Sequence, residues 1–216
     1  MNLPMHIPAG AMFVFAALSA YLLQREVEVM QSVVTRGPAA VVATGPRGPL
    51  SPSHWANELS LRTCDAALIE PYASVYSAAY YEQAATNCFA AAQFTLRNAP
   101  TSSFAHYVAA AAAQRQNETE LFREHLTLSQ RFGAAEGWLS ERRLQLAVRA
   151  GMPWQDALVA SELPVLLATQ AGAEMLARFY ATVPDARPAI RSAAANAPKP
   201  QQQRLLNRIT RAGFAG

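Results

Sequence analysis

A self-similarity with a period of 34 residues constrains the fold of this chain more than any other sequence feature. The positions that match after this shift hold breakers, aromatic residues, alanines and arginines: residues 97–100 with 131–134, Phe104 with Trp138, Ala113 with Ala147, and Arg115 with Arg149. Each half has a helical stretch that ends at a breaker and a second that an aromatic residue opens. Such a hairpin has an apolar face too large to bury alone. The period therefore predicts helix hairpins that stack on one another over residues 80–151.

The first of these units resembles a tetratricopeptide repeat. The resemblance rests on small and aromatic residues on either side of a proline: Cys88, Ala92 and Thr95 before Pro100, and Phe104, His106, Ala109, Ala110 and Ala113 after it. The sequence departs from the family pattern at the Ala109-Ala110 pair and at Ala113, where the family has Leu-Gly and tyrosine. The resemblance implies a stack of antiparallel helix hairpins over residues 54–216. The alternative is an irregular bundle of Ala-rich helices, in which the matching shift is a coincidence.

Composition supports an all-α fold and argues against nucleic-acid binding. Hydrophobic residues make up 51% of the chain, which is ample for a core. Alanine dominates, and no alternation of Val, Ile and Tyr indicates strands. The formal net charge of +3 is too small to indicate a nucleic-acid partner by itself.

The N-terminus contains an uncharged, mostly apolar stretch at residues 9–23. With Ile7 and Pro8 it reaches about the lower limit for a helix that crosses a bilayer. We therefore expect residues 1–34 to form a membrane anchor that contacts the bilayer through residues 7–23. Two alternatives remain open. One is a cleaved signal peptide, although the segment has no basic n-region and has Leu18 and Ala20 at the two cleavage positions. The other is a buried core helix.

A stretch rich in Pro and Gly follows at residues 35–53. Such a composition does not form a helix and predicts a linker. The helical domain is then expected to begin at His54 and to continue to residue 216, with Ser53 as the N-cap of its first helix. Further along, Asn117 and Glu120 have the spacing of a capping box, and Pro164 predicts a break or kink.

Cys64 and Cys88 are the two cysteines of the chain, and each falls on an apolar-patterned helix. The 23 intervening residues suffice to turn the chain, so we predict a disulfide between antiparallel helices. A pair of buried free thiols is the alternative. The bond favours an oxidising compartment. Arg25, Arg36 and Arg47 favour the opposite orientation because positive charge prefers the cytoplasmic side. We expect a single-pass protein of the bacterial inner membrane with its repeat domain in the periplasm.

Signals for catalysis are absent from the sequence. The histidines (His6, His54, His106 and His125) do not stand at metal-ligand spacing with one another or with a cysteine. No nucleophile elbow, phosphate loop or dinucleotide turn occurs. We therefore predict no enzyme activity, no metal and no cofactor. An enzyme acting on cell-wall glycan is the disfavoured alternative because no carboxylate pair is signalled.

The family resemblance also implies a partner-binding groove on the first helix of each pair. Its candidate residues are Tyr107, Gln114, Arg115, Glu141, Gln145 and Arg149. Phe104 and Trp138 occupy equivalent positions and are predicted to be core between hairpins.

Together these features resemble small tetratricopeptide-like envelope proteins, some of which accompany machinery that makes or exports polysaccharide. We predict a non-catalytic adaptor or scaffold that binds another membrane or envelope protein. The alternative is an accessory subunit of a large membrane complex, whose N-terminal helix packs against other transmembrane helices. Small residues would allow that close approach: Gly10, Ala11, Ala16, Ala17 and Ser19.

Overall fold

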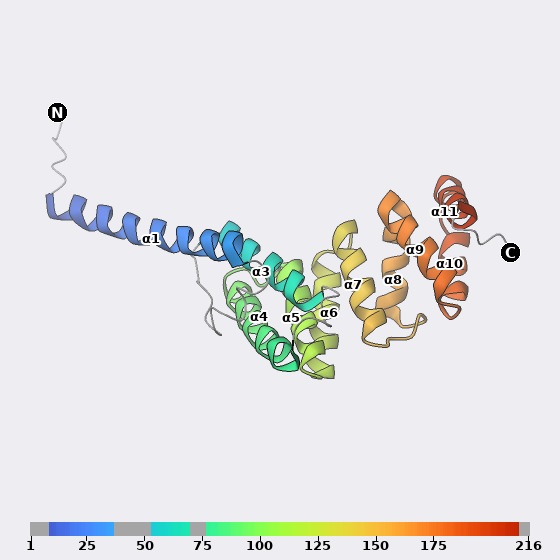
Figure 1. The fold of residues 1–216 in the computed structure, drawn as a ribbon. Coiled ribbons are helices and arrows are strands. Elements are labelled where there is room, and N and C mark those ends of the chain that lie inside the picture. Colours follow the sequence, from blue (N-terminus) through green and yellow to red (C-terminus); the bar gives the residue numbers. More distant parts are fainter. Residues whose placement is uncertain (1–8, 37–52, 70–76, 212–216) are drawn as a thin grey trace, which may run out of the picture. The chain divides into compact units, whose positions relative to one another are not determined.

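The computed structural model describes residues 9–36, 53–69 and 77–211, and regular structure in these ranges is entirely helical (Figure 1). The prediction of an all-α chain is confirmed for them. The helices, in chain order, are α1 (Ala9–Arg36), α3 (His54–Ile69), α4 (Ala78–Asn98), α5 (Ser103–Arg115), α6 (Thr119–Phe132), α7 (Gly137–Arg149), α8 (Ala157–Ala168), α9 (Gln170–Thr182), α10 (Ala186–Ala195) and α11 (Lys199–Arg211). Most of the predicted linker lies outside the described residues.

Contacts between Cα atoms divide the chain into two compact units, Met1–Asn98 and Ala99–Gly216. The division falls inside the segment predicted as one helical-repeat domain. The boundaries predicted at residues 34 and 53 are not tested by it and stay predictions.

In the first unit, α3 and α4 form a helix pair that buries several alanines together with Leu61 and Leu68. Ser53 caps α3 as predicted, because its Oγ accepts a hydrogen bond from the Ala56 amide at 3.1 Å. The apolar side chains that the pair buries include Ala56, Ala84, Ala85 and Ala92. Small side chains allow two helices to approach closely, but each removes little apolar area from water.

Helix α1 is 28 residues long and begins in the uncharged stretch. Its side chains from residue 12 to residue 24 are all exposed. None of the helices in the described ranges combines the length and mean hydropathy of a membrane span.

In the second unit, the 34-residue period returns as a repeated turn. Helices α5 and α7 begin 34 residues apart and each has 13 residues. Asn117 after α5 and Gly151 after α7 both have left-handed backbones, with φ of 61° and 73°. The residue that follows each left-handed residue donates its amide to the carbonyl five residues earlier: Glu118 to Ala113 at 2.9 Å, and Met152 to Ala147 at 3.0 Å. These are Schellman-type helix ends.

The left-handed Asn117 also corrects the predicted capping box. The N-cap of α6 is Glu118, and its side chain makes no capping hydrogen bond. Asn117 instead serves the end of α5, because asparagine tolerates the left-handed region better than most residues. The turn at Gly133 does end α6, where the Gly133 amide donates to the Ser129 carbonyl at 3.0 Å.

Helix α8 runs without interruption through Pro164, so the predicted break is absent. Asp156 caps the helix by accepting a hydrogen bond from the Leu158 amide at 3.0 Å. Pro164 has no amide hydrogen, so the Ala160 carbonyl lacks the donor that an ordinary helix supplies four residues later.

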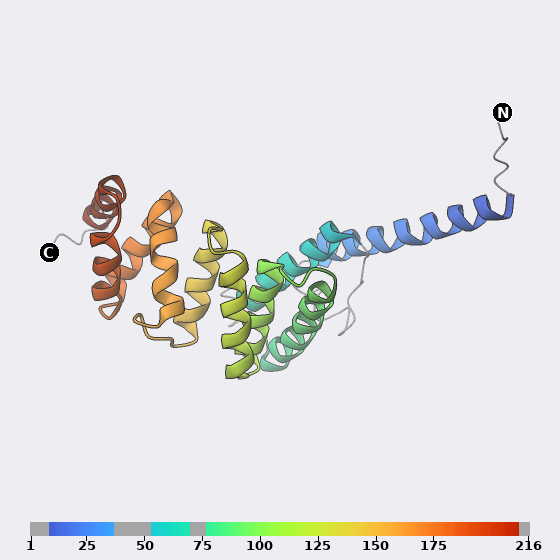
Figure 2. The same ribbon diagram turned by 180° about the vertical axis from the view of Figure 1, so that it is seen from behind.

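Arginines of α10 and α11 donate hydrogen bonds to the C-terminal ends of α9 and α8; Figure 2 shows these helices from behind. Arg187 Nε donates to the Tyr180 carbonyl near the end of α9 at 2.9 Å. Arg204 Nη1 donates to the Ala168 carbonyl at the end of α8 at 2.9 Å. Both guanidinium groups meet carbonyls that have no intrahelical partner, at the negative ends of the helix dipoles.

Candidate functional site

Cys64 on α3 and Cys88 on α4 form a disulfide, and the prediction is confirmed. Their Cα atoms are 5.5 Å apart, and both residues are buried. The alternative of two buried free thiols does not hold, since no described cysteine is free. The bond is a covalent link between α3 and α4.

The predicted groove residues lie on α5 and α7, but they do not form one exposed surface. Tyr107 is fully buried and stacks on Phe104, with ring centroids 6.0 Å apart. This corrects its assignment to the groove, because a side chain without solvent exposure is not available to a partner. The other five are partly exposed or exposed: Gln114, Arg115, Glu141, Gln145 and Arg149. Their role in binding a partner stays a prediction.

The spacing of four residues places Glu141, Gln145 and Arg149 on one face of α7. Arg149 is anchored along this face, since its Nε donates to the Gln145 carbonyl at 3.3 Å. Burial raises the pKa of Glu141, and the positive charges of Arg142 and Arg178 partly oppose that rise. The face therefore presents a half-buried carboxyl group beside arginines. Such a group suits polar recognition of a partner.

Phe104 and Trp138 are in contact, but they do not play equivalent roles. Their ring centroids are 5.2 Å apart in an edge-to-face arrangement. Phe104 is only 7% exposed, whereas Trp138 is 47% exposed. The prediction that both are core is therefore wrong for Trp138, which covers Phe104 from the solvent side.

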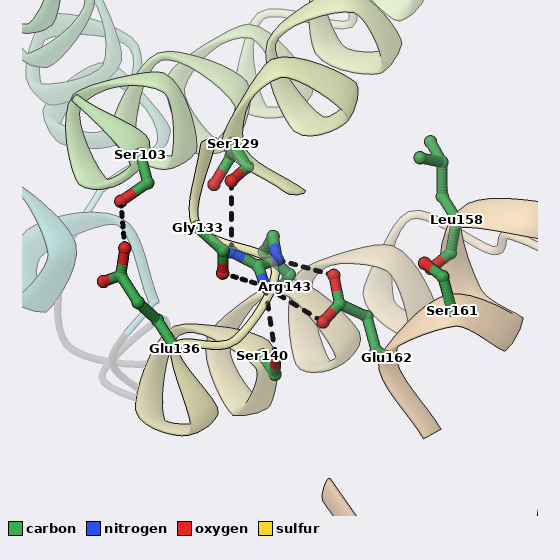
Figure 3. A network of polar contacts seen from close by, with 9 residues as sticks. All are labelled: Ser103, Ser129, Gly133, Glu136, Ser140, Arg143, Leu158, Ser161 and Glu162. Atoms are coloured by element: carbon green, nitrogen blue, oxygen red, sulfur yellow. Dashed lines mark hydrogen bonds and ion pairs between the residues drawn. The ribbon is translucent and has the colours of Figure 1, made fainter. Parts of the chain in front are cut away.

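An ion pair between Arg143 of α7 and Glu162 of α8 is the most deeply buried charged site in the described chain (Figure 3). The two side chains are 1% and 4% exposed. Arg143 meets the carboxylate with two nitrogens, Nε to Oε1 and Nη2 to Oε2, the latter at 3.0 Å. This bidentate geometry is the strongest form of an arginine–carboxylate pair.

The same guanidinium also holds the end of α6. Arg143 Nη1 donates to the Ser129 carbonyl at 3.3 Å, and Nη2 donates to the Gly133 carbonyl at 3.1 Å. A hydrogen bond to Ser140 Oγ at 3.1 Å completes the set. Figure 3 shows these groups converging on Arg143 from α6, α7 and α8. We call Arg143, Glu162 and their partners the arginine clamp; it fixes three helices and offers no opening to a substrate.

A second buried polar pair consists of His106 on α5 and His125 on α6. Their Nδ1 atoms are 3.0 Å apart, and His106 Nε2 lies 3.0 Å from the Pro100 carbonyl. The carbonyl can only accept, so His106 carries its hydrogen on Nε2 and His125 donates from Nδ1. Burial lowers the pKa of both imidazoles; His106 further lowers that of His125, and Glu124 opposes the shift in each. No third ligand group for a metal gathers with them in the described residues.

The described residues of the second unit include a cleft and an apolar groove. One is a cleft of about 300 Å³ at the repeated turns, which includes Gln114, Asn117, Arg123 and Gly151. Arg123 there is paired with Asp156 at 2.9 Å. Burial would raise the pKa of Asp156, but the hydrogen bonds from Arg123 and from the Leu158 amide lower it overall. The other is an apolar groove of about 550 Å³ along α8 and α10.

Comparisons with protein families, curated proteins and solved structures find no match to this chain. Sequence reasoning missed the arginine clamp, the histidine pair and the apolar groove, each of which joins residues far apart in the chain.

Proposed function

We propose that this chain is a non-catalytic, membrane-anchored helical-repeat adaptor of the bacterial cell envelope. The observation that carries the proposal is the exposed apolar surface of α1. In its first half, the large apolar side chains that are more than one third exposed are Met12, Phe13, Val14, Phe15, Leu18, Tyr21, Leu22 and Leu23, and Val27 and Met30 follow further along. Exposed apolar surface of this extent marks a contact with a membrane or with another protein.

The disulfide supports a periplasmic location for the helical domain. Disulfides persist in the periplasm and are rare in the cytosol. A single pass through the inner membrane would place α1 in the bilayer and the disulfide outside it. On this proposal the bond outweighs the orientation favoured by Arg25 and Arg36.

An adaptor role is supported by the repeated helix turns at Asn117 and Gly151. Helical repeats of the tetratricopeptide type present surfaces to partner proteins, and the buried charges Arg143 and Glu162 brace helices of the second unit. The partner is then another membrane or envelope protein, and assistance to polysaccharide synthesis or export is one setting for it.

Membrane attachment is tested by fractionating bacteria that express the full chain. The parent should remain with membranes after carbonate washing and be released by detergent. Removal of residues 1–34 should give a soluble protein that melts cooperatively and keeps the helical circular dichroism signal of the helices from α3 onward, with only the contribution of α1 lost. A truncated chain that loses its helical signal would show that α1 belongs to the core.

A matched pair of variants sharpens this test. Phe13→Arg with Phe15→Arg should release the protein from membranes, because two charges enter the uncharged stretch. Met30→Arg changes a side chain that is also exposed but lies beyond residue 23. It should leave the protein in the membrane fraction; equal behaviour of the two variants would contradict the anchor.

The alternative function is that of an accessory subunit in a large membrane complex. It is favoured by the open space around Gly10, where an added Cβ would meet nothing within 4 Å, and by the small residues that follow it. Such residues allow another helix to approach closely. Co-purification in stoichiometric amount with a membrane assembly would support this alternative over a free adaptor.

A further inference from the structure

The net positive charge of the chain is concentrated in the helices α9, α10 and α11. Residues 170–211 contain seven basic side chains and two acidic ones, Glu174 and Asp185, which gives a local net charge of +5. The whole chain has a formal net charge of only +3, so its other residues are slightly acidic when taken together. We call residues 170–211 the basic end. A separation of charge on this scale creates a field that acts on partners beyond single contacts.

The two acids of the basic end compensate little of its charge. Glu174 meets Arg208 only at 3.8 Å, and the Glu174 side chain is 51% exposed. Asp185 makes no capping hydrogen bond at the start of α10. Exposed ion pairs contribute little, because water and salt screen them. Most of the positive charge at the basic end is therefore not neutralised within the chain.

Several cations of the basic end are exposed. Arg191, Lys199 and Arg211 form no ion pair with a residue in the described ranges. Arg178 on α9 is exposed too, and its charge acts on the Glu141 carboxyl of α7 without forming an ion pair. These four side chains are available to a partner from outside the chain.

Two of the exposed cations come to the same level where α9 and α11 lie side by side. Arg204 donates to the C-terminal end of α8, which directly precedes α9, and Arg208 pairs with Glu174 further along α9. The two helices therefore run in the same direction. The next turn of each brings Arg211 to the level of Arg178. Like charges placed together repel one another, and an external anion relieves that repulsion.

The basic end suits an extended anionic surface better than a small anion. None of its seven cations lines the cleft or the apolar groove. A small anion would therefore stay in water, where salt screens its attraction to each cation. Cations spread over three helices act together only on charges that are themselves spread over a surface.

A bilayer with anionic headgroups matches this surface in charge and in its exposed apolar residue. Helix α11 carries four basic side chains and no acidic one in 13 residues, a pattern typical of binding to anionic lipids. Leu206 is 56% exposed and lies two turns from Lys199 on the same side of α11. A basic helix with an exposed apolar side chain suits the boundary between headgroups and acyl chains.

We propose that the basic end docks on a bilayer that contains anionic phospholipids, as a second membrane contact beside α1. The charge argument stands without α1, but the high local concentration of bilayer rests on the anchor proposed above. Each basic side chain close to such a surface raises the partition onto it about fivefold at low salt. Loss of two should therefore weaken docking about 25-fold.

Lys199 is the single lysine of the chain and reports directly on the basic end. The full chain is reconstituted in vesicles of phosphatidylcholine, with or without phosphatidylglycerol. Acylation of the Lys199 amine by an uncharged N-hydroxysuccinimide ester is then followed by peptide mass spectrometry. Docking should slow this reaction several-fold in the anionic vesicles, and high salt should remove the difference because the attraction is electrostatic.

A matched pair of variants separates the position of the charges from their number. Arg178→Gln with Arg211→Gln should make the acylation rates in the two kinds of vesicle equal. Arg97→Gln with Arg131→Gln is the control, since it also removes two exposed arginines but lies outside the basic end. The control should behave like the parent. Circular dichroism melting curves check that both variants are folded.

Three results overturn the proposal: equal acylation rates of the parent in both kinds of vesicle, slowing that survives in Arg178→Gln with Arg211→Gln, or slowing that is lost in the control. Polyglutamate added to the phosphatidylcholine vesicles tests an acidic protein as the partner. Protection of Lys199 by polyglutamate but not by anionic vesicles would assign the surface to such a protein and also overturn the proposal.

The same vesicles keep this inference apart from the anchor. Retention of the chain in phosphatidylcholine alone reports α1, because neutral headgroups do not attract the basic end. A chain that leaves these vesicles but sediments with the anionic ones would contradict the anchor and support the docking surface.

Discussion

The helix pair α3–α4 and the helices α5 to α8 are held together in different ways. The pair buries mainly alanines along its contact and is joined by the Cys64–Cys88 bond. Helices α6, α7 and α8 contain no cysteine and are braced by Arg143, whose guanidinium reaches all three. Alanine side chains bury little apolar area, so the disulfide adds stability that the α3–α4 contact alone does not supply. Helices α6, α7 and α8 bury larger side chains such as Phe122, Leu144 and Leu166, and there the added cross-link is ionic.

The largest effect should follow from breaking the arginine clamp. Arg143→Ala leaves the Glu162 carboxylate buried without its partner and frees two carbonyls at the end of α6. We expect a loss of about 3–5 kcal/mol in the free energy of unfolding, measured by urea denaturation.

A double variant is the control for the clamp. Arg143→Met with Glu162→Leu removes both charges and fills the space with apolar atoms, so the loss should be much smaller than for Arg143→Ala. A single variant as stable as the parent would mean that the clamp does not brace these helices.

Breaking the covalent cross-link should have the next largest effect. Replacing Cys64 and Cys88 with alanine should cost roughly 3–4 kcal/mol by the loop-entropy argument, because the unfolded chain regains freedom. Thermal melting with and without a reducing agent measures it. The reductant should lower the Tm of the parent and leave the variant unchanged; a parent insensitive to the reductant after full reduction would contradict the role of the bond.

The histidine pair should make the second unit sensitive to mild acid. Because the pKa of each folded imidazole lies below 6.5, the unfolded chain binds more protons between pH 6.5 and the lowered folded values. Stability contributed by the pair is complete above pH 6.5 and decreases as the pH falls below it. Urea titrations from pH 7 to pH 5 should show this slope.

His106→Gln with His125→Gln tests the origin of that slope. The double variant should be less stable at pH 7 but should depend less on pH in this range. An unchanged slope would assign the acid sensitivity to other groups.

The smallest effect is expected at Trp138. Since its side chain is half-exposed, Trp138→Ala should cost about 1–2 kcal/mol, less than the 3–5 kcal/mol typical of a buried aromatic residue. Trp138→Phe keeps a ring against Phe104 and should be nearly neutral. A loss of 3 kcal/mol or more on Trp138→Ala would return this side chain to the core.

Features set by local sequence could be predicted, and features set by long-range pairing could not. Helix α3 begins at His54, as its Ser53 cap predicted. Cys64 and Cys88 each had only the other as a possible disulfide partner, so their pairing could be predicted too. Arg143 and Glu162, by contrast, look like ordinary exposed charges of amphipathic helices. Only the packing of α7 on α8 brings them together, across 19 residues of sequence.

The repeat pattern predicted equivalent positions but not equivalent environments. The 34-residue shift matched Phe104 to Trp138, yet the first is buried and the second covers it. It also matched Ala113 to Ala147, and there the match extends to the backbone, since both carbonyls accept the closing bond of a left-handed turn. Turn geometry depends on a few adjacent residues, whereas exposure depends on what the neighbouring helices bring.

The central claim is a membrane-anchored chain whose helical domain lies in an oxidising compartment. Its most direct test is alkylation of the protein in native membranes without a reductant, followed by intact mass determination. We expect no labelled thiol before reduction and two labelled thiols after it. Two labelled thiols before reduction would contradict the disulfide in the cell and, with it, the periplasmic placement of the helical domain.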